Sequence, residues 1–293
     1  MKTVDLTKEI RTAPPSGLRY EALLGDGGGE TRALWEQVFT EDTAAFLDYY
    51  YKEKIIDARI HVLKDQNGQI VSMVHENPYD VMMHGVRRRT YYMVGVATAK
   101  EYRHRGCMAF LLQKAVLSAK REGCPFVFLM PADAAIYKPF GFRYDGQLSM
   151  WEGSAYLKER MTGNMPSDSI SVQVWLTPYS DADAGALAAY AEKALAKRYD
   201  TYCVHDEAYF DRLNRELISE NGGIYLLWKR EHEKDALCGY FCYACEEEEY
   251  LQEVIVDREA EVLFCKKSSR ERIMFLALED ACPYGRTYFP EIV

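Results

Sequence analysis

The residues best suited to chemistry lie in one stretch, Tyr91–Leu112, which reads YYMVGVATAKEYRHRGCMAFLL. The apolar run 92–97 predicts a buried strand, and the apolar spacing after Gly106 predicts a helix with one buried face. A turn with three basic residues, 103–105, joins the two. Because the first N–H groups of a helix attract anions and glycine permits close backbone approach, this stretch predicts a site for an anionic group.

The spacing in this turn excludes two common nucleotide loops. No Gly-Lys-Ser/Thr follows, as a P-loop requires, and Gly-x-Gly-x-x-Gly is absent. The residues 103–108, RHRGCM, instead resemble the acyl-CoA pyrophosphate loop of the GNAT superfamily of N-acetyltransferases, Arg/Gln-x-x-Gly-x-Gly/Ala. Met108 departs from that pattern at its last position, a departure typical of the Eis-like (enhanced intracellular survival) branch. The competing interpretation is an ordinary strand and helix joined by a basic turn.

A second stretch strengthens the resemblance. Residues 126–130 predict another buried strand, and Ile136-Tyr137-x-x-Phe140-Gly141-Phe142 follows it. The GNAT family has a short helix with a tyrosine and then a Phe-Gly-Phe/Tyr turn at this point. The chain is therefore identified as a member of the family, with the resemblance strong over roughly residues 20–150. Eis-like proteins usually carry a third, sterol-carrier-like domain, and we expect none in this chain.

The resemblance implies an α/β (α+β) fold with tandem GNAT-like domains, each a mixed, mostly antiparallel sheet flanked by helices. We expect a catalytic domain over residues 1–152 and a degenerate copy over 165–293, whose tail returns to the active site. In the second copy, the acidic segment 257–261 stands where the phosphate loop would be. Acids repel a pyrophosphate, so we expect this copy not to bind CoA.

Local patterns place further elements. Apolar spacing predicts a helix over 31–51, and Asn67-Gly68 predicts a hairpin between strands 58–63 and 69–75. The polar run 76–90 reads as the lead into the central strand. In the second half, Ser180-Asp-Ala-Asp183 predicts a helix start, and a second helix, a hairpin and the strand 250–256 follow.

The implied activity is acetyl-CoA-dependent transfer of an acetyl group to a primary amine by direct attack in a ternary complex. Tyr137 is the expected general acid for the leaving thiolate, and backbone groups of the central strand are expected to pair with the pantetheine arm. The residues expected to hold CoA are Val94, Val96, Thr98, Arg103, His104, Arg105, Gly106, Cys107 and Met108.

The sequence identifies the residues that would bind the acceptor amine less clearly than those that would bind CoA. Trp35 and Phe39 are candidates for substrate contact by the same resemblance, with core packing the favoured interpretation. Eis-like proteins use a chain-terminal carboxylate, which makes the Val293 carboxylate a candidate general base. His75, Glu76 and Asp133 are further candidates without support from spacing.

Cys107 indicates an alternative mechanism, in which the acetyl group passes through a covalent intermediate on the enzyme. At a helix start the pKa of Cys107 could be lowered, and its thiol would then accept the acetyl group covalently. Direct transfer is the favoured interpretation, because related proteins usually have a plain hydrophobe at this position.

Composition limits the partners. The formal net charge of −9 argues against nucleic acid, and no apolar run has the length of a membrane span. Eight cysteines without a secretion signal predict reduced thiols and a cytoplasmic location. The expected partner is a small-molecule or peptide amine, and the sequence leaves homo-oligomer formation open.

No metal site is expected. Cys238, Cys242 and Cys245 have the spacing of an iron–sulfur motif, but alternation along a strand would put the first two on one face and the third on the other. Two other functions stay open: an aminoacyl-tRNA-dependent transferase of tandem GNAT fold, and a non-catalytic acyl-CoA-binding or regulatory module.

Overall fold

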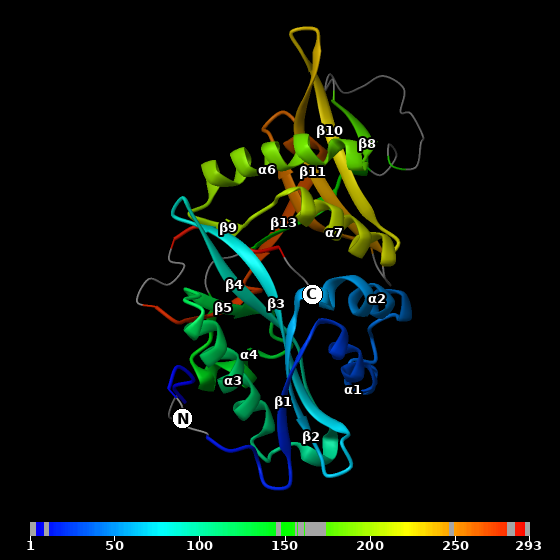
Figure 1. The fold of residues 1–293 in the computed structure, drawn as a ribbon. Helices are drawn as coiled ribbons and strands as arrows, with labels where there is room; N and C mark the ends of the chain where they lie inside the picture. Colours follow the sequence, from blue (N-terminus) through cyan, green and yellow to red (C-terminus); the bar gives the residue numbers. More distant parts are fainter. Residues whose placement is uncertain are drawn as a thin grey trace.

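Two β-sheets, each flanked by helices, make up the molecule in the computed structural model (Figure 1). The structure describes residues 4–8, 12–144, 148–155, 157, 161, 174–245, 249–279 and 285–290. The predicted class, tandem α/β units with mainly antiparallel sheets, is confirmed.

The first sheet has nine strands in the described residues, with the order β1-β2-β3-β4-β5-β14-β6, and β9 and β15 extend it beside β3. Its neighbours are antiparallel except for β4–β5 and β9–β15. The strands are β1 (Arg19–Leu24), β2 (Arg59–Lys64), β3 (Ile70–Met83), β4 (Val86–Thr98), β5 (Phe126–Leu129), β6 (Arg143–Tyr144), β9 (Thr201–Cys203), β14 (Met274–Ala277) and β15 (Thr287–Tyr288).

The β2–β3 hairpin forms where Asn-Gly predicts it, but β3 is longer than expected. The polar run 76–90 is not a lead-in: it continues β3, turns at His84-Gly85 with φ of 48° and 81°, and begins β4. Polarity misleads here because both polar side chains are buried with partners: Glu76 accepts from Arg59 of β2, and Asn77 accepts from the Tyr50 hydroxyl.

Helices cover both faces of the first sheet. They are α1 (Arg32–Val38), α2 (Ala44–Tyr49), α3 (Cys107–Arg121) and the short α4 (Ala134–Tyr137). The helical spacing over 31–51 is divided between two helices. The first ends at Val38, and the Thr43 hydroxyl accepts from the Phe46 N–H to begin α2, which continues into a π-helical turn, Tyr50–Lys54. No helix in the described residues is long and apolar enough to cross a membrane.

The second sheet is antiparallel throughout, with the order β13-β7-β12-β11-β10-β8 in the described residues. Helices α6 (Ala184–Arg198) and α7 (Glu207–Ser219) pack on one face, and the predicted capping box of Ser180 and Asp183 precedes α6. The strands are β7 (Leu148–Gly153), β8 (Val174–Pro178), β10 (Gly223–Glu231), β11 (Lys234–Cys245), β12 (Glu249–Val256) and β13 (Phe264–Arg270).

The two sheets share one core rather than standing apart. The largest cluster of buried residues joins β3 and β5 of the first sheet to α6, α7 and β11 of the second unit. Strand pairing also crosses the expected boundary, because β14, β9 and β15 belong to the first sheet and β7 to the second. The division into 1–152 and 165–293 stays a prediction, and most of the segment between falls outside the described residues.

A β-bulge changes the expected placement of the cysteines in β11. The pairing of β10 with β11 shifts between Leu227 and Trp228, so that Cys238 is the extra residue. Cys238 packs in the core with Phe241, whereas Cys242 packs on the other face. The prediction that Cys238 and Cys242 share a face is therefore wrong.

The segment 257–261 forms turns ahead of β13, with a short 3-10 turn, Glu261–Leu263, instead of a helix like α3. The second unit thus has no equivalent of the strand, glycine turn and helix in the described residues.

A buried ion pair ties the two units together at α7. Lys54 Nζ lies 3.0 Å from Glu216 Oε2, and both side chains are only 6% exposed. Replacing Lys54 with methionine leaves the Glu216 carboxylate buried without its cation, so the free energy of unfolding should fall by about 3–5 kcal/mol. Urea denaturation measures it. The control is Arg215→Ala, which removes an exposed pair with Glu53 and should cost below about 1 kcal/mol. Equal losses in both variants would contradict the assignment.

Candidate active site

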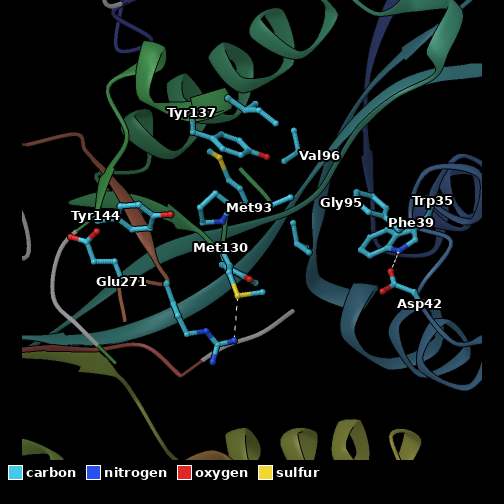
Figure 2. Close-up of a pocket in the computed structure, with 16 residues that line it drawn as sticks. Trp35, Phe39, Asp42, Met93, Gly95, Val96, Met130, Tyr137, Tyr144 and Glu271 are labelled. Atoms are coloured by element: carbon cyan, nitrogen blue, oxygen red, sulfur yellow. Dashed lines mark hydrogen bonds between the residues drawn. The ribbon is translucent and has the colours of Figure 1, made fainter. Parts of the chain in front are cut away.

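The central cavity lies where β4 and β5 part. These parallel strands pair only at Tyr91–Val127 and Tyr92–Phe128. Beyond those pairs the strands diverge, and the residues that follow on each strand line a cavity of about 430 Å³ (Figure 2). The backbone of β4 at Val94 to Val96 therefore faces the cavity instead of a neighbouring strand.

A β-bulge shapes this part of β4. Val94 pairs with His75 and Ala97 with Met73, so Gly95 and Val96 together oppose one residue of β3. Gly95 has a φ of +59°, and a Cβ built on it would lie 2.5 Å from Cζ3 of Trp35. Glycine is thus required here, both for the bend and for the indole ring that packs on it.

Tyr137 stands at the cavity on α4. The Asp133 carboxylate begins this helix by accepting from the Ala135 N–H at 2.8 Å, so Asp133 is a helix cap rather than a free base. The Tyr137 ring packs edge-on against Phe142 of the Phe-Gly-Phe turn, with centroids 5.9 Å apart. Burial raises the pKa of Tyr137 to about 12, and Figure 2 shows its hydroxyl directed toward Val96.

The basic turn leads into α3 as predicted. Gly106 has a φ of +81° and is the N-cap of α3, whose first N–H groups have no intrahelical acceptor. Arg103, His104 and Arg105 are exposed on the turn. Arg103 Nε donates to the Thr98 carbonyl at 3.1 Å, and the Arg105 guanidinium lies 5.0 Å from the centre of the Tyr102 ring.

Not every predicted CoA residue lies at the cavity. Val94 and Val96 line it, whereas Thr98 does not, and its hydroxyl lies 2.8 Å from that of Ser72. Met108 packs partly against the core beneath α3. Cys107 is buried, and burial raises the pKa of its thiol, so the suggestion of a lowered pKa there is wrong.

Trp35 and Phe39 of α1 both line the cavity, with ring centroids 5.4 Å apart. Trp35 is also 2% exposed and packs on Tyr50 and His75, so the core-packing interpretation is correct for it, and its contact with substrate stays a prediction. Its indole Nε1 donates to Oδ2 of Asp42 at 2.6 Å. The aromatic wall therefore ends in a carboxylate.

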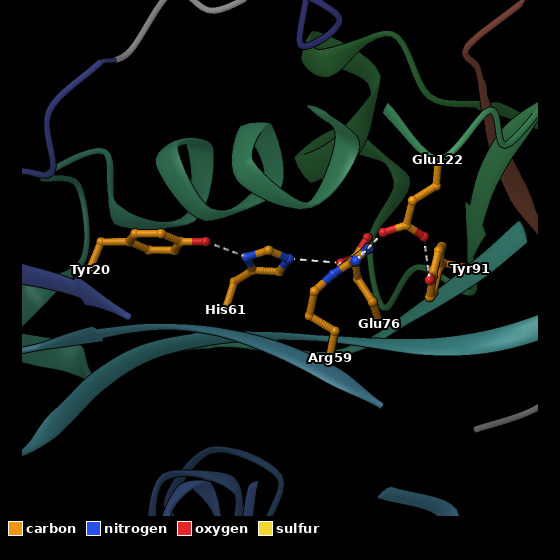
Figure 3. Close-up of polar contacts among 6 residues, drawn as sticks. All are labelled: Tyr20, Arg59, His61, Glu76, Tyr91 and Glu122. Atoms are coloured by element: carbon orange, nitrogen blue, oxygen red, sulfur yellow. Dashed lines mark hydrogen bonds and ion pairs between the residues drawn. The ribbon is translucent and has the colours of Figure 1, made fainter. Parts of the chain in front are cut away.

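Two of the candidate bases are occupied elsewhere. Glu76 Oε2 lies 2.7 Å from both His61 Nε2 and Arg59 Nε, in a buried network beneath α3 (Figure 3). His75 is fully buried behind Trp35, where burial lowers its pKa to about 3. Neither residue lines the cavity. Val293 lies outside the described residues.

The sequence reasoning missed several lining residues. Asp42 lies just before α2, where a continuous helix was expected. Glu271 and Arg272 precede β14, and only the pairing of β14 with β5 brings them to the cavity. Figure 2 shows Trp35 and Asp42 at one side and Tyr144 and Glu271 at the other. The missed lining residues are Asp42, Tyr92, Met93, Gly95, Met130, Pro131, Ala132, Ile136, Tyr144, Glu271 and Arg272.

Three features occur together in this part of the structure: a bulged central strand that parts from its neighbour, a glycine turn before a helix, and a tyrosine at the gap. The sequence model of the acetyltransferase (GNAT) domain matches residues 29–144. Residues 29–144 therefore form a GNAT acetyltransferase domain, a family that transfers acyl groups from acyl-CoA, and the chain is an enzyme of the acyltransferase class. A comparison with curated proteins gives no match.

Solved structures share the fold across most of the chain. A probable N-acyltransferase from Enterococcus faecalis V583 has a TM-score of 0.67 at 14% identity, covering 89% of this chain and 72% of that one. A GCN5-related N-acetyltransferase from Kribbella flavida has a TM-score of 0.65 at 17% identity, with the same coverage, 89% and 72%. Eis1 from Mycobacterium abscessus has a TM-score of 0.61 at 10% identity, covering 89% and 74%. At these identities the likeness concerns the fold alone.

The contact of Gly95 with Trp35 gives a direct test of the cavity wall. Gly95→Ala should displace the indole and break its hydrogen bond to Asp42, at a cost of about 1–3 kcal/mol from overpacking in addition to backbone strain. Denaturation and tryptophan fluorescence measure the two effects. Gly68→Ala is the matched control, because Gly68 also has a positive φ, +81°, with nothing within 4 Å of its Cβ. Equal costs in both variants would show that packing on Trp35 contributes nothing.

Proposed function

We propose that the chain transfers an acetyl group from acetyl-CoA to a primary amine by direct attack in a ternary complex. The observation that carries this proposal is the opening between β4 and β5. It joins unpaired backbone at Val94 and Val96, the Tyr137 hydroxyl and an aromatic wall in one cavity. A donor thioester and an acceptor amine could both reach such a cavity.

CoA would lie along the free edge of β4. Its pantetheine amides would pair with backbone groups of Val94 and Val96 as an added strand does, satisfying groups that the parting of β5 leaves without a partner. The pyrophosphate would lie on the N-terminus of α3, where Gly106 permits close approach. The exposed side chains of 103–105 would add positive charge around it.

The chemistry needs a proton for the leaving thiolate. The amine nitrogen attacks the thioester carbonyl, the C–S bond breaks, and Tyr137 donates its proton to the sulfur. With a phenol pKa of about 12 and a thiol pKa of about 8.5, that transfer is uphill by roughly 5 kcal/mol between the separated groups. The phenol therefore stays protonated at neutral pH, and its position beside the sulfur must supply the advantage.

Three further assignments belong to this proposal. We place the chain in the Eis-like branch because Met108 ends the phosphate loop and the fold resembles Eis1. We propose a cytoplasmic location, as the cysteine content suggests. We keep the Val293 carboxylate as a candidate base, as the resemblance to Eis-like proteins implies.

The phosphate loop is tested by charge reversal. Arg103→Glu, or Gly106→Asp, should weaken acetyl-CoA binding by at least about tenfold, because each sets a carboxylate against the pyrophosphate or blocks the backbone approach. Calorimetry measures the dissociation constant. Arg121→Glu makes the same charge change at the far end of α3 and should leave it within about twofold. Unchanged affinity in the folded Arg103→Glu and Gly106→Asp variants would exclude the loop as the CoA site.

The acid role is tested by removing one hydroxyl. Tyr137→Phe should lower kcat by about a hundredfold or more while acetyl-CoA affinity is nearly kept, since general acid catalysis typically contributes that much. Stopped-flow thiol release and calorimetry measure the two quantities. Tyr144→Phe, at the other side of the cavity, is the matched control and should retain most of its kcat. Full turnover in Tyr137→Phe would rule out the acid role.

A further inference from the structure

An alkylamine acceptor raises a proton problem that Tyr137 does not solve. With a pKa near 10, only about one amine in a thousand is neutral at pH 7. The protonated form has no lone pair for attack, so a group in the cavity must bind the ammonium and take its proton. Among the described residues, Asp42 and Glu271 are the two carboxylates that line the cavity.

Asp42 has the features of a built binding group. Its Oδ2 accepts from the Trp35 indole at 2.6 Å, which fixes the orientation of the carboxylate. Its Oδ1 has no hydrogen-bond partner in the part of the chain that the structure describes. Trp35 and Phe39 stand beside it, and aromatic faces next to a carboxylate attract an alkylammonium ion.

The surroundings favour Asp42 as a proton acceptor over Glu271. Asp42 is half-buried, whereas Glu271 is exposed to water next to Arg272. Burial raises the pKa of Asp42, which the Trp35 hydrogen bond partly offsets, and Glu41 adds to the rise. The other charged groups of the cavity wall are Glu271 and Arg272, and His75 behind Trp35 is neutral at pH 7.

We propose that Asp42 binds the ammonium group of the acceptor beside Trp35 and accepts its proton, so that the acceptor class is a cationic alkylamine. This inference rests on the proposed function. The ammonium gives one proton to Asp42, and its freed lone pair forms the bond to the thioester carbon. The C–S bond then breaks and the sulfur takes the Tyr137 proton. The nitrogen loses its second proton, which returns through water to the Tyr137 phenolate, and Asp42 releases the first proton to water. The products are the amide, the CoA thiol and one proton released to water overall.

The test is Asp42→Asn with two acceptors. Asparagine keeps an oxygen for the Trp35 N–H but cannot take a proton. For an alkylamine, kcat/KM should fall by about a hundredfold near pH 7. For an aromatic amine, which is already neutral at pH 7, it should change by less than about threefold. Glu41→Gln is the control, since it removes the neighbouring charge without touching the cavity, and it should change neither value more than about twofold.

The pH profile separates a proton acceptor from a structural residue. The productive wild-type form has ionised Asp42 and protonated amine, so kcat/KM should be flat between their two pKa values. It should fall on the acid side at a higher pH than an ordinary carboxyl would give, because the pKa of Asp42 is raised. Asp42→Asn must use the rare neutral amine, so its kcat/KM should rise tenfold per pH unit through neutral pH.

Two results would overturn the inference. One is a flat profile in Asp42→Asn, with equal effects on both amines. The other is a kcat/KM that rises tenfold per pH unit in Glu271→Gln, or after deletion of residues 292–293, and not in Asp42→Asn. In either case thiol release by the wild type would leave the proposed function standing. A wild-type protein that released no thiol with either amine would overturn both.

Discussion

The opening between β4 and β5 is the constraint on which the rest of the site depends. A strand in the middle of a sheet normally has all its N–H and C=O groups paired, and unpaired buried groups are costly. Here β5 keeps its other neighbour, β14, along its whole length, while β4 is turned away by the bulge at Gly95 and Val96. The sheet thus holds an internal edge that a ligand with amide groups can complete.

The same opening constrains the packing of Trp35, which lines the cavity next to the bulge. Trp35 can pack on the bulge only because Gly95 has no Cβ. The indole is held from behind by Tyr50 and His75, and Tyr50 begins the π-helical turn that ends at Lys54. Lys54 forms an ion pair with Glu216 of α7, so the second unit stabilises the turn that supports the Trp35 side of the cavity.

Local sequence predicts part of this site well. The glycine turn and Tyr137 lie within short, contiguous motifs. The local residues also determine the backbone geometry of these motifs, namely the φ of +81° at Gly106 and the cap of α4 at Asp133. Local sequence likewise predicts α3 from the spacing of its buried face, and the β2–β3 hairpin from its Asn-Gly turn.

Long-range pairing is what the sequence does not reveal. The four residues of β14 are apolar and could pair with either sheet, so nothing local indicates that Glu271 and Arg272 reach the cavity. The apolar residues keep helical spacing across the break before Thr43. The sequence therefore does not indicate that Asp42 lies outside a helix and lines the cavity. In β11, one extra residue at Cys238 reverses the faces that simple alternation assigns.

The second half of the chain contributes directly to the cavity. It supplies β14, which covers the edge of β5, and the buried residues of β5 pack with Phe275 and Phe289 from the same part of the chain. Without that strand, Phe126–Leu129 would be an exposed apolar edge next to the cavity. Strand β14 holds β5 in place while β4 departs, and that separation forms the cavity.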